Sequence, residues 1–149
     1  MTDLSFFVPG LAKTAGSKRA FPFRRTNGSL GVRVTDDAGE KGKNWRTMVS
    51  ILGKQIMAGK PPLDGPLEVR FLFELLRPKG HFGKHALKPS APKYPTVKPD
   101  LLKLARAVED ALTGIAWIDD AQIVQEHISK GYGSNPGVTI FVTRLPSLP

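Results

Sequence analysis

The segment KPDLLKLARAVEDAL, residues 98–112, decides the fold and supplies the first candidate site residue. Its apolar residues recur at intervals of three and four, which predicts an amphipathic helix over 101–113 that ends at Gly114. The predicted core-facing residues are Leu101, Leu104, Val108 and Leu112. Asp100 stands just before this helix, where a carboxylate can cap free backbone N–H groups. Leu102 departs from the pattern, because positions 106 and 109 on its side of the helix are charged.

The composition indicates a folded chain with a single domain over residues 1–149. Forty per cent of the 149 residues are hydrophobic, which is enough for a modest core. The absence of cysteine excludes a disulfide framework and a thiolate metal site. No apolar run approaches the roughly 20 residues of a membrane helix, and the start MTDLSFFVPG lacks the basic region of a signal peptide. We therefore expect a cytoplasmic protein without a membrane partner.

The charge is unevenly distributed. The formal net charge is +9, which favours a polyanionic partner, nucleic acid before membrane. Residues 77–98 contain six Lys or Arg and no acid, whereas residues 100–126 contain six of the 13 acids. When a basic protein has its carboxylates gathered in one short segment, we expect these carboxylates to have a functional role. A basic RNA-binding domain with a solvated acidic turn is one alternative.

The remaining periodicity predicts an α+β fold in which a small mixed β-sheet packs with helices. We expect strands at 4–8, 30–35, 67–75, 122–129 and 137–143, and helices at 43–59 and 101–113. The first helix is predicted from Trp45, Met48, Val49, Leu52 and Ile56. Residues 16–25 are expected to be extended, and KGYGSNP is expected to form a hairpin-like connection between the last two strands. The Pro-, Gly- and Lys-rich segment before Lys98 is a long loop of a kind that is often functional.

A second acidic pair, Asp119-Asp120, follows the helix. Two adjacent carboxylates in an exposed turn are one interpretation. The other is that Asp100 and Asp120 converge on a divalent cation, since Mg²⁺ prefers oxygen ligands and needs only one or two protein carboxylates. Such an ion activates water for phosphodiester hydrolysis, and Arg106 is placed to stabilise the developing charge.

The sequence from Lys98 to Gly133 resembles the core signature of the RusA family of Holliday junction resolvases. The shared elements are K-P-D, D-A-L and D-D-A-Q, at residues 98–100, 110–112 and 119–122. The resemblance implies a homodimeric endonuclease of phage, prophage or bacterial origin. It also implies dependence on Mg²⁺, for which Mn²⁺ can substitute, and the paired nicking of four-way DNA junctions.

The resemblance also implies roles for individual residues. Asp100 corresponds to the first metal-binding aspartate, and Asp120 to a further one with Asp119 beside it. Arg106 stands where the family commonly has a catalytic lysine, and guanidinium and ammonium differ in geometry and proton chemistry. Asp110 occupies the acidic position of D-A-L, where a structural role is expected.

Leu102 breaks the family pattern, because it replaces an aspartate with a side chain that cannot bind a metal. Three explanations are open. The enzyme is inactivated but still binds junctions, or the remaining aspartates suffice, or Glu109 reaches toward the missing ligand from about two helical turns away, roughly 10 Å. The first explanation defines the alternative function, a DNA-binding protein of the same fold without nuclease activity.

Basic residues surround the predicted site. The candidate phosphate contacts are Lys18, Arg19, Arg24, Arg25, Lys84, Lys88, Lys93 and Lys98. Aromatic residues interleaved with them are suited either to stacking on bases or to packing; they are Phe21, Phe23, Phe82 and Tyr94. His81 and His85 have zinc-ligand spacing, but their loop contains a glycine, so we expect them to be solvated or to contact phosphate.

Overall fold

The computed structural model describes residues 1–15, 18–36 and 39–149, with the side chains of 18–21 and 34–36 outside the described part. The strands are β1 (Leu4–Pro9), β2 (Lys18–Arg24), β3 (Leu30–Asp36), β4 (Leu67–Leu75), β5 (Ile123–Tyr132) and β6 (Gly137–Arg144). The helices are α1 (Gly39–Met57) and α2 (Leu101–Leu112), with short 3-10 turns η1 (Lys79–His81) and η2 (Asp120–Gln122). Within these ranges, neither helix is long and apolar enough to cross a membrane.

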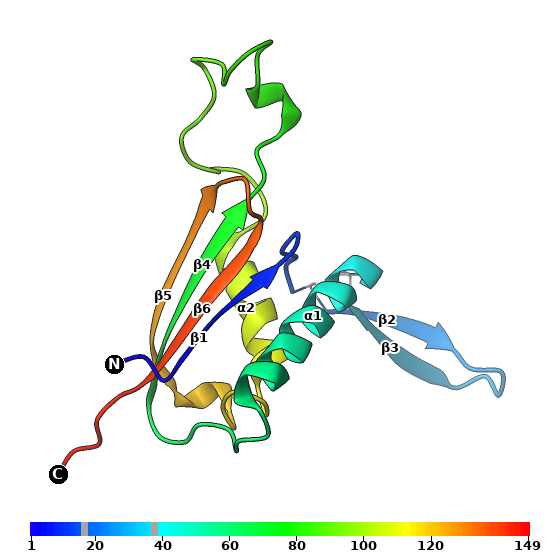
Figure 1. Ribbon diagram of the computed structural model, residues 1–149. Helices are drawn as coiled ribbons and strands as arrows, with labels where there is room; N and C mark the ends of the chain where they lie inside the picture. Colours follow the sequence, from blue (N-terminus) through cyan, green and yellow to red (C-terminus); the bar gives the residue numbers. More distant parts are fainter. Residues whose placement is uncertain (16–17, 37–38) are drawn as a thin grey trace.

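The main sheet has four strands in the order β1-β6-β4-β5 (Figure 1). β4 pairs antiparallel with β6 and parallel with β5, so the prediction of an α+β fold with a mixed sheet is confirmed. The expected hairpin between the last two strands is wrong, because β4 lies between β5 and β6. β4 lies in the centre of the sheet between β6 and β5, and Val69 and Phe71 on its apolar face are fully buried.

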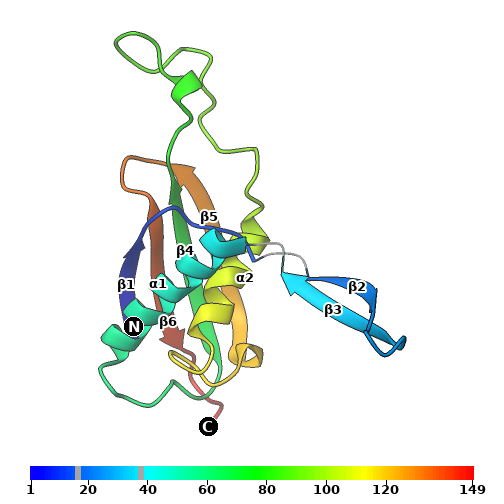
Figure 2. The ribbon, with the colours of Figure 1, turned by 90° about the vertical axis from the view of Figure 1, so that its right-hand side faces the viewer.

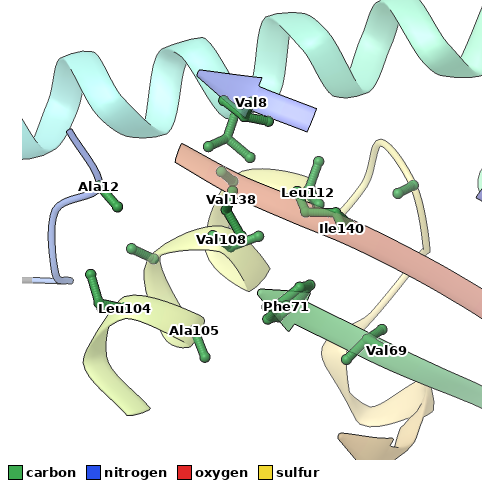
Figure 3. Packing of buried hydrophobic residues seen from close by; sticks show 14 of the residues in the cluster. Val8, Ala12, Val69, Phe71, Leu104, Ala105, Val108, Leu112, Val138 and Ile140 are labelled. Atoms are coloured by element: carbon green, nitrogen blue, oxygen red, sulfur yellow. The ribbon is translucent and has the colours of Figure 1, made fainter. Parts of the chain in front are cut away.

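Both helices cover one face of this sheet (Figures 1 and 2). Alternate residues of the strands point into the layer between sheet and helices. Figure 3 shows Val138 and Ile140 of β6 facing Val108 and Leu112 of α2, while Val8 of β1 lies beneath α1. These side chains are fully buried, so this layer is the core.

Helix α1 begins four residues before the predicted start and ends two residues before the predicted end. Trp45 and Val49 are buried as the spacing predicts, but Met48 and Ile56 are 43% and 40% exposed. The reason is Gly53, whose absent Cβ would lie 2.6 Å from Leu112 Cδ2. This glycine lets α1 approach α2 closely, and the buried face of α1 therefore turns toward Gly53.

Helix α2 ends at Leu112, within one residue of the prediction. Leu104, Val108 and Leu112 are fully buried, whereas Leu102 is 73% exposed. The apolar stripe therefore faces the core as expected, and Leu102 lies on the opposite, charged side of the helix.

Two segments project from this layered body (Figures 1 and 2). β2 and β3 form a separate two-stranded antiparallel sheet, which confirms the extended conformation expected for 18–24. Gly16 and Ser17, also expected to be extended, lie outside the described residues. The second projection is the loop of residues 76–100, which joins β4 to α2 and contains η1.

The burial of α2 leads to a matched pair of mutations. Leu104→Ala leaves a cavity in the core and is expected to lower the free energy of unfolding by about 3 kcal/mol. Leu102→Ala, the same change two residues earlier, is expected to alter it by less than about 0.5 kcal/mol. Urea denaturation followed by circular dichroism measures both values. Equal losses would show that α2 is packed by a different face.

Candidate carboxylate site

Asp100 lies at the N-terminal end of α2, in the N-cap position, with φ −69° and ψ 136°. Its side chain makes no capping hydrogen bond, so the predicted capping role is wrong. Instead, the Asp100 Oδ2 lies 3.4 Å from Lys103 Nζ, and both side chains are 55% exposed. The Asp100 carboxylate points toward solvent and toward Lys103, one helical turn away. The carboxylate is therefore accessible.

The segment before Asp100 is fixed by a lysine that the sequence did not single out. Lys130 Nζ of β5 donates hydrogen bonds to the carbonyl oxygens of Val97 and Pro99, both at 2.8 Å. The Pro99 carbonyl directly precedes Asp100. Lys130 thus ties the end of the long loop, and with it the start of α2, to the edge strand of the sheet.

Asp120 lies beyond the other end of α2. Its Oδ1 accepts a hydrogen bond from Trp117 Nε1 at 2.9 Å and another from the Thr113 hydroxyl. Trp117 is fully buried, and Thr113 is the C-cap residue of α2. Hydrogen bonds from a buried indole and a helix cap fix the position of this carboxylate, so Asp120 is more than part of an exposed acidic turn.

Asp119 has a local structural role. It is the N-cap of η2, and its Oδ1 accepts from Ala121 N at 2.8 Å. Gln122 completes the capping box, because its Oε1 accepts from Asp119 N at 3.0 Å. The Gln122 amide also donates to the carbonyl oxygens of Leu63 and Gly65, at 3.1 and 3.0 Å. The D-D-A-Q sequence therefore builds the turn that presents Asp120.

The structure does not bring Asp100 and Asp120 together within one chain. They lie at opposite ends of the 12-residue helix α2, which is about 18 Å long at a rise of 1.5 Å per residue. Across the described ranges, no three His, Cys, Asp or Glu side chains are grouped to hold a metal ion. The expected convergence is therefore not met by a single copy, because the helix packed in the core holds the two carboxylates apart.

A different set of carboxylates gathers near Asp120. Glu109 of α2 is half-buried, and burial raises its pKa to about 8. A hydrogen bond to the Glu126 side chain and the negative charges of Glu126, Asp120 and Asp110 act in the same direction. Glu126 lies on β5 and pairs with Val69, so it points to the helix side of the sheet. The sequence gives no signal for Glu126, because one glutamate in a strand belongs to no motif.

The exposed side of α2 carries a row of side chains that runs from the Asp100 end of the helix toward the Asp120 end. Leu102 and Arg106 are both exposed and lie four residues apart, on one line along the helix. This line begins beside Asp100 and continues toward Glu109 and Asp120. Arg106, the position of the expected catalytic cation, therefore lies between the two predicted metal ligands.

The candidate phosphate contacts divide between the two projections. Arg24 and Arg25 are exposed on the β2–β3 hairpin, whereas the side chains of Lys18 and Arg19 lie outside the described part. Those of the 76–100 loop are all exposed: Lys84, Lys88, Lys93 and Lys98.

The aromatic and histidine side chains of the 76–100 loop differ in their surroundings. The ring of His81 packs edge-on against Tyr132 at 5.5 Å between centroids, and Arg77 lies 4.4 Å over the Tyr132 ring. His81 therefore helps to pack the base of the loop on β5. Phe82 and Tyr94 are 50% and 60% exposed, so they remain available for stacking.

Two comparisons relate the chain to known proteins. The chain is 28% identical over 114 residues to the uncharacterized protein YqaN of Bacillus subtilis (strain 168), covering 74% of this chain and 78% of that protein. Residues 16–143 match the family described as endodeoxyribonuclease RusA. This match includes both projections, α2 and the D-D-A-Q turn, and the chain therefore belongs to the RusA family of endodeoxyribonucleases.

Proposed function

We propose that this protein is a structure-specific endonuclease that binds four-way DNA junctions and nicks two opposing strands with the help of Mg²⁺. The observation that carries the proposal is the RusA match over residues 16–143. The net charge of +9 and the basic side chains on both projections suit a branched polyanion. The catalytic and metal-binding residues are proposed to be Asp100, Asp119, Asp120 and Arg106.

The distance between the carboxylates leads us to a two-chain site. In one chain, Asp100 and Asp120 lie at opposite ends of α2, a helix about 18 Å long. A two-fold axis across the exposed line of α2 would set the two α2 helices antiparallel, with the start of one beside the end of the other. Asp100 of one copy would then face Asp120 of the second copy. The dimer would contain two such sites, which suits two symmetric nicks.

The proposed ligands are suited to Mg²⁺. Asp100 is accessible, and both recorded hydrogen bonds to Asp120 end on Oδ1, so Oδ2 is the oxygen proposed to bind the ion. Mg²⁺ keeps several waters and requires one or two carboxylates. When bound, the ion would supply an activated water and neutralise charge on the attacked phosphate. Trp117 and Thr113 would hold Asp120 in position, and Arg106 would bind the scissile phosphate.

Glu109 and Glu126 are proposed to support the Asp120 end of this site. Their shared hydrogen bond requires a proton, and the pKa of Glu109, about 8, keeps that proton near neutral pH. With this proton, Glu109 and Glu126 together carry one negative charge fewer, which lowers the electrostatic repulsion around Asp120. Glu109 is in the last turns of α2 and remote from Leu102 in the first turn, so it does not replace the ligand missing at position 102 in the same chain.

The alternative function rests on Leu102. Its side chain is 73% exposed and apolar, at a position where the family pattern has an acid. A protein of this fold with a weakened metal site would bind junctions and not cut them.

Mixing two inactive variants tests the two-chain site. We expect Asp100→Asn and Asp120→Asn each to abolish nicking of a labelled four-way junction in Mg²⁺. Co-assembled heterodimers would regain one intact site, made from the unmodified Asp100 and Asp120 of different chains. Random assembly is expected to restore about a quarter of the wild-type nicking rate. If the mixture stays inactive while sedimentation shows heterodimers, each site lies within one chain.

The role of position 102 is tested by restoring the acid. Leu102→Asp is expected to raise the nicking rate at limiting Mg²⁺ and to lower the Mg²⁺ concentration needed for half-maximal rate, because a third carboxylate strengthens the site. Leu102→Asn, of similar size but uncharged, is the control. If nicking responds equally to both variants, position 102 contributes no ligand. If wild type binds junctions and never nicks them, the alternative function holds.

The raised pKa of Glu109 predicts a pH dependence of stability in metal-free protein. The pKa rises from 4.5 to about 8 on folding, so the folded state holds the proton more tightly. Its contribution is complete below pH 4.5 and is lost as the pH rises through about 8. Urea denaturation in EDTA should therefore show the free energy of unfolding falling over this range. Glu109→Gln should flatten the decline, whereas Glu40→Gln, at an exposed position in the first turn of α1, should leave it unchanged. Equal slopes for wild type and both variants would contradict the prediction.

A further inference from the structure

The β2–β3 hairpin has two different faces that the main body does not cover. Cross-strand pairing places Arg24 opposite Leu30 and Pro22 opposite Val32 on one face. Leu30 and Val32 are 70% and 67% exposed there. A hairpin of this kind is marginally stable by itself and normally buries its apolar face against another layer. Both ribbon views show the hairpin pointing away from the sheet and helices, so this face needs an external partner.

The other face carries cations arranged on an aromatic ring. Phe23 is opposite Gly31, and its ring lies over that glycine, since a Cβ at Gly31 would be 2.8 Å from Phe23 Cζ. The guanidinium carbons of Arg25 and Arg33 lie 6.0 and 5.6 Å from the ring centroid. Phe23 is therefore a packing residue that supports two arginines, and it is not free to stack on bases.

The turn of the hairpin is well defined. Arg25 N donates to Ser29 O at 2.8 Å, and the Arg25 guanidinium reaches Leu30 O at 3.3 Å. Asn27 Oδ1 accepts from the Ser29 hydroxyl at 2.6 Å. The tip thus keeps its shape, and the cations on both faces are presented by a preformed ribbon.

The positive charge and the dimensions of the β2–β3 hairpin indicate its partner. The hairpin, residues 18–36, contains five Lys or Arg and one acid, Asp36, which is paired with Lys18 at the base. Strands of seven residues make a ribbon about 24 Å long. The major groove of B-DNA, about 12 Å wide, admits a two-stranded ribbon and offers thymine methyl groups to apolar side chains. A second copy of this basic ribbon would be repelled by the first.

We propose that the β2–β3 hairpin is an arm that enters the major groove of a DNA duplex beside the cleavage point. Leu30 and Val32 face the groove floor, Arg24 reaches from the same face to the phosphates of one wall, and Arg33, on the opposite face, contacts phosphates at the outer rim of the groove. The inference rests on the proposed function only in taking DNA as the substrate. In this role the hairpin binds a duplex arm of the junction through a surface that is separate from the carboxylate site.

The test measures binding without cleavage. Fluorescence anisotropy with a linear DNA duplex in EDTA gives the dissociation constant over a series of salt concentrations. Arg24→Ala/Arg33→Ala is expected to weaken binding on the order of tenfold and to reduce the slope of log K against log salt by about 0.9 for each lost phosphate contact. Arg25 is left unchanged because it holds the turn. Lys54→Ala/Lys60→Ala, in the last turn of α1 and just beyond its end, removes the same charge and is expected to leave the slope unchanged.

A second variant tests the groove itself. Leu30→Ser/Val32→Ser is expected to weaken binding to the DNA duplex and not to an RNA duplex of the same sequence, whose major groove is too deep and narrow for side chains. Equal losses on both duplexes, or equal salt slopes for the arginine and lysine variants, would overturn the assignment. So would loss of a dimer in sedimentation with either arm variant, because the hairpin would then be covered by a second copy. Failure of wild type to nick junctions leaves these binding results intact and counts only against the proposed function.

Discussion

Burial of the apolar stripe of α2 determines the positions of the candidate site residues. Leu104, Val108 and Leu112 are fully buried in the core layer between the sheet and the helices. Each such side chain contributes roughly 1.5–3 kcal/mol through removal of apolar surface from water. The exposed ion pair between Asp100 and Lys103 contributes at most about 1 kcal/mol. The core therefore sets the direction and length of α2, and the carboxylates at its ends are carried to wherever that packing places them.

The two ends of α2 are held by different kinds of interaction. Asp120 accepts hydrogen bonds from a buried indole and a helix-cap hydroxyl, so its orientation follows from the core. Asp100 is positioned through its backbone, since Lys130 binds the carbonyl groups that precede it while its side chain faces solvent. One carboxylate is preorganised and the other is free to turn. A site assembled from two chains suits this difference, because the mobile carboxylate can adjust to the fixed one.

Periodicity predicts much of this fold and little of its connectivity. The spacing of three and four residues locates α2 within one residue, and the alternation in residues 67–75 locates β4 with both bounds correct. Neither pattern shows that β4 lies between β5 and β6, because an alternating strand looks the same with either neighbour. The buried face of α1 was misplaced since a glycine, Gly53, has no hydrophobicity to detect. Spacing and the family resemblance make Asp100 and Asp120 candidate ligands, but the length of α2 between them is visible only once both ends of the helix are placed.

The two projections carry charge opposite to that of the carboxylate cluster. Four carboxylates cluster where α2 ends and β5 begins, and burial of Glu109, together with the negative charge of the other three, raises its pKa. A DNA backbone approaching this region meets like charge, which opposes binding at the place where cleavage is proposed. The basic hairpin and the basic 76–100 loop supply the opposite charge on extensions of the same body. For the proposed binding, attraction at the projections must exceed repulsion at the carboxylates, and a divalent cation at Asp120 would reduce that repulsion. Binding and metal loading are therefore expected to favour each other.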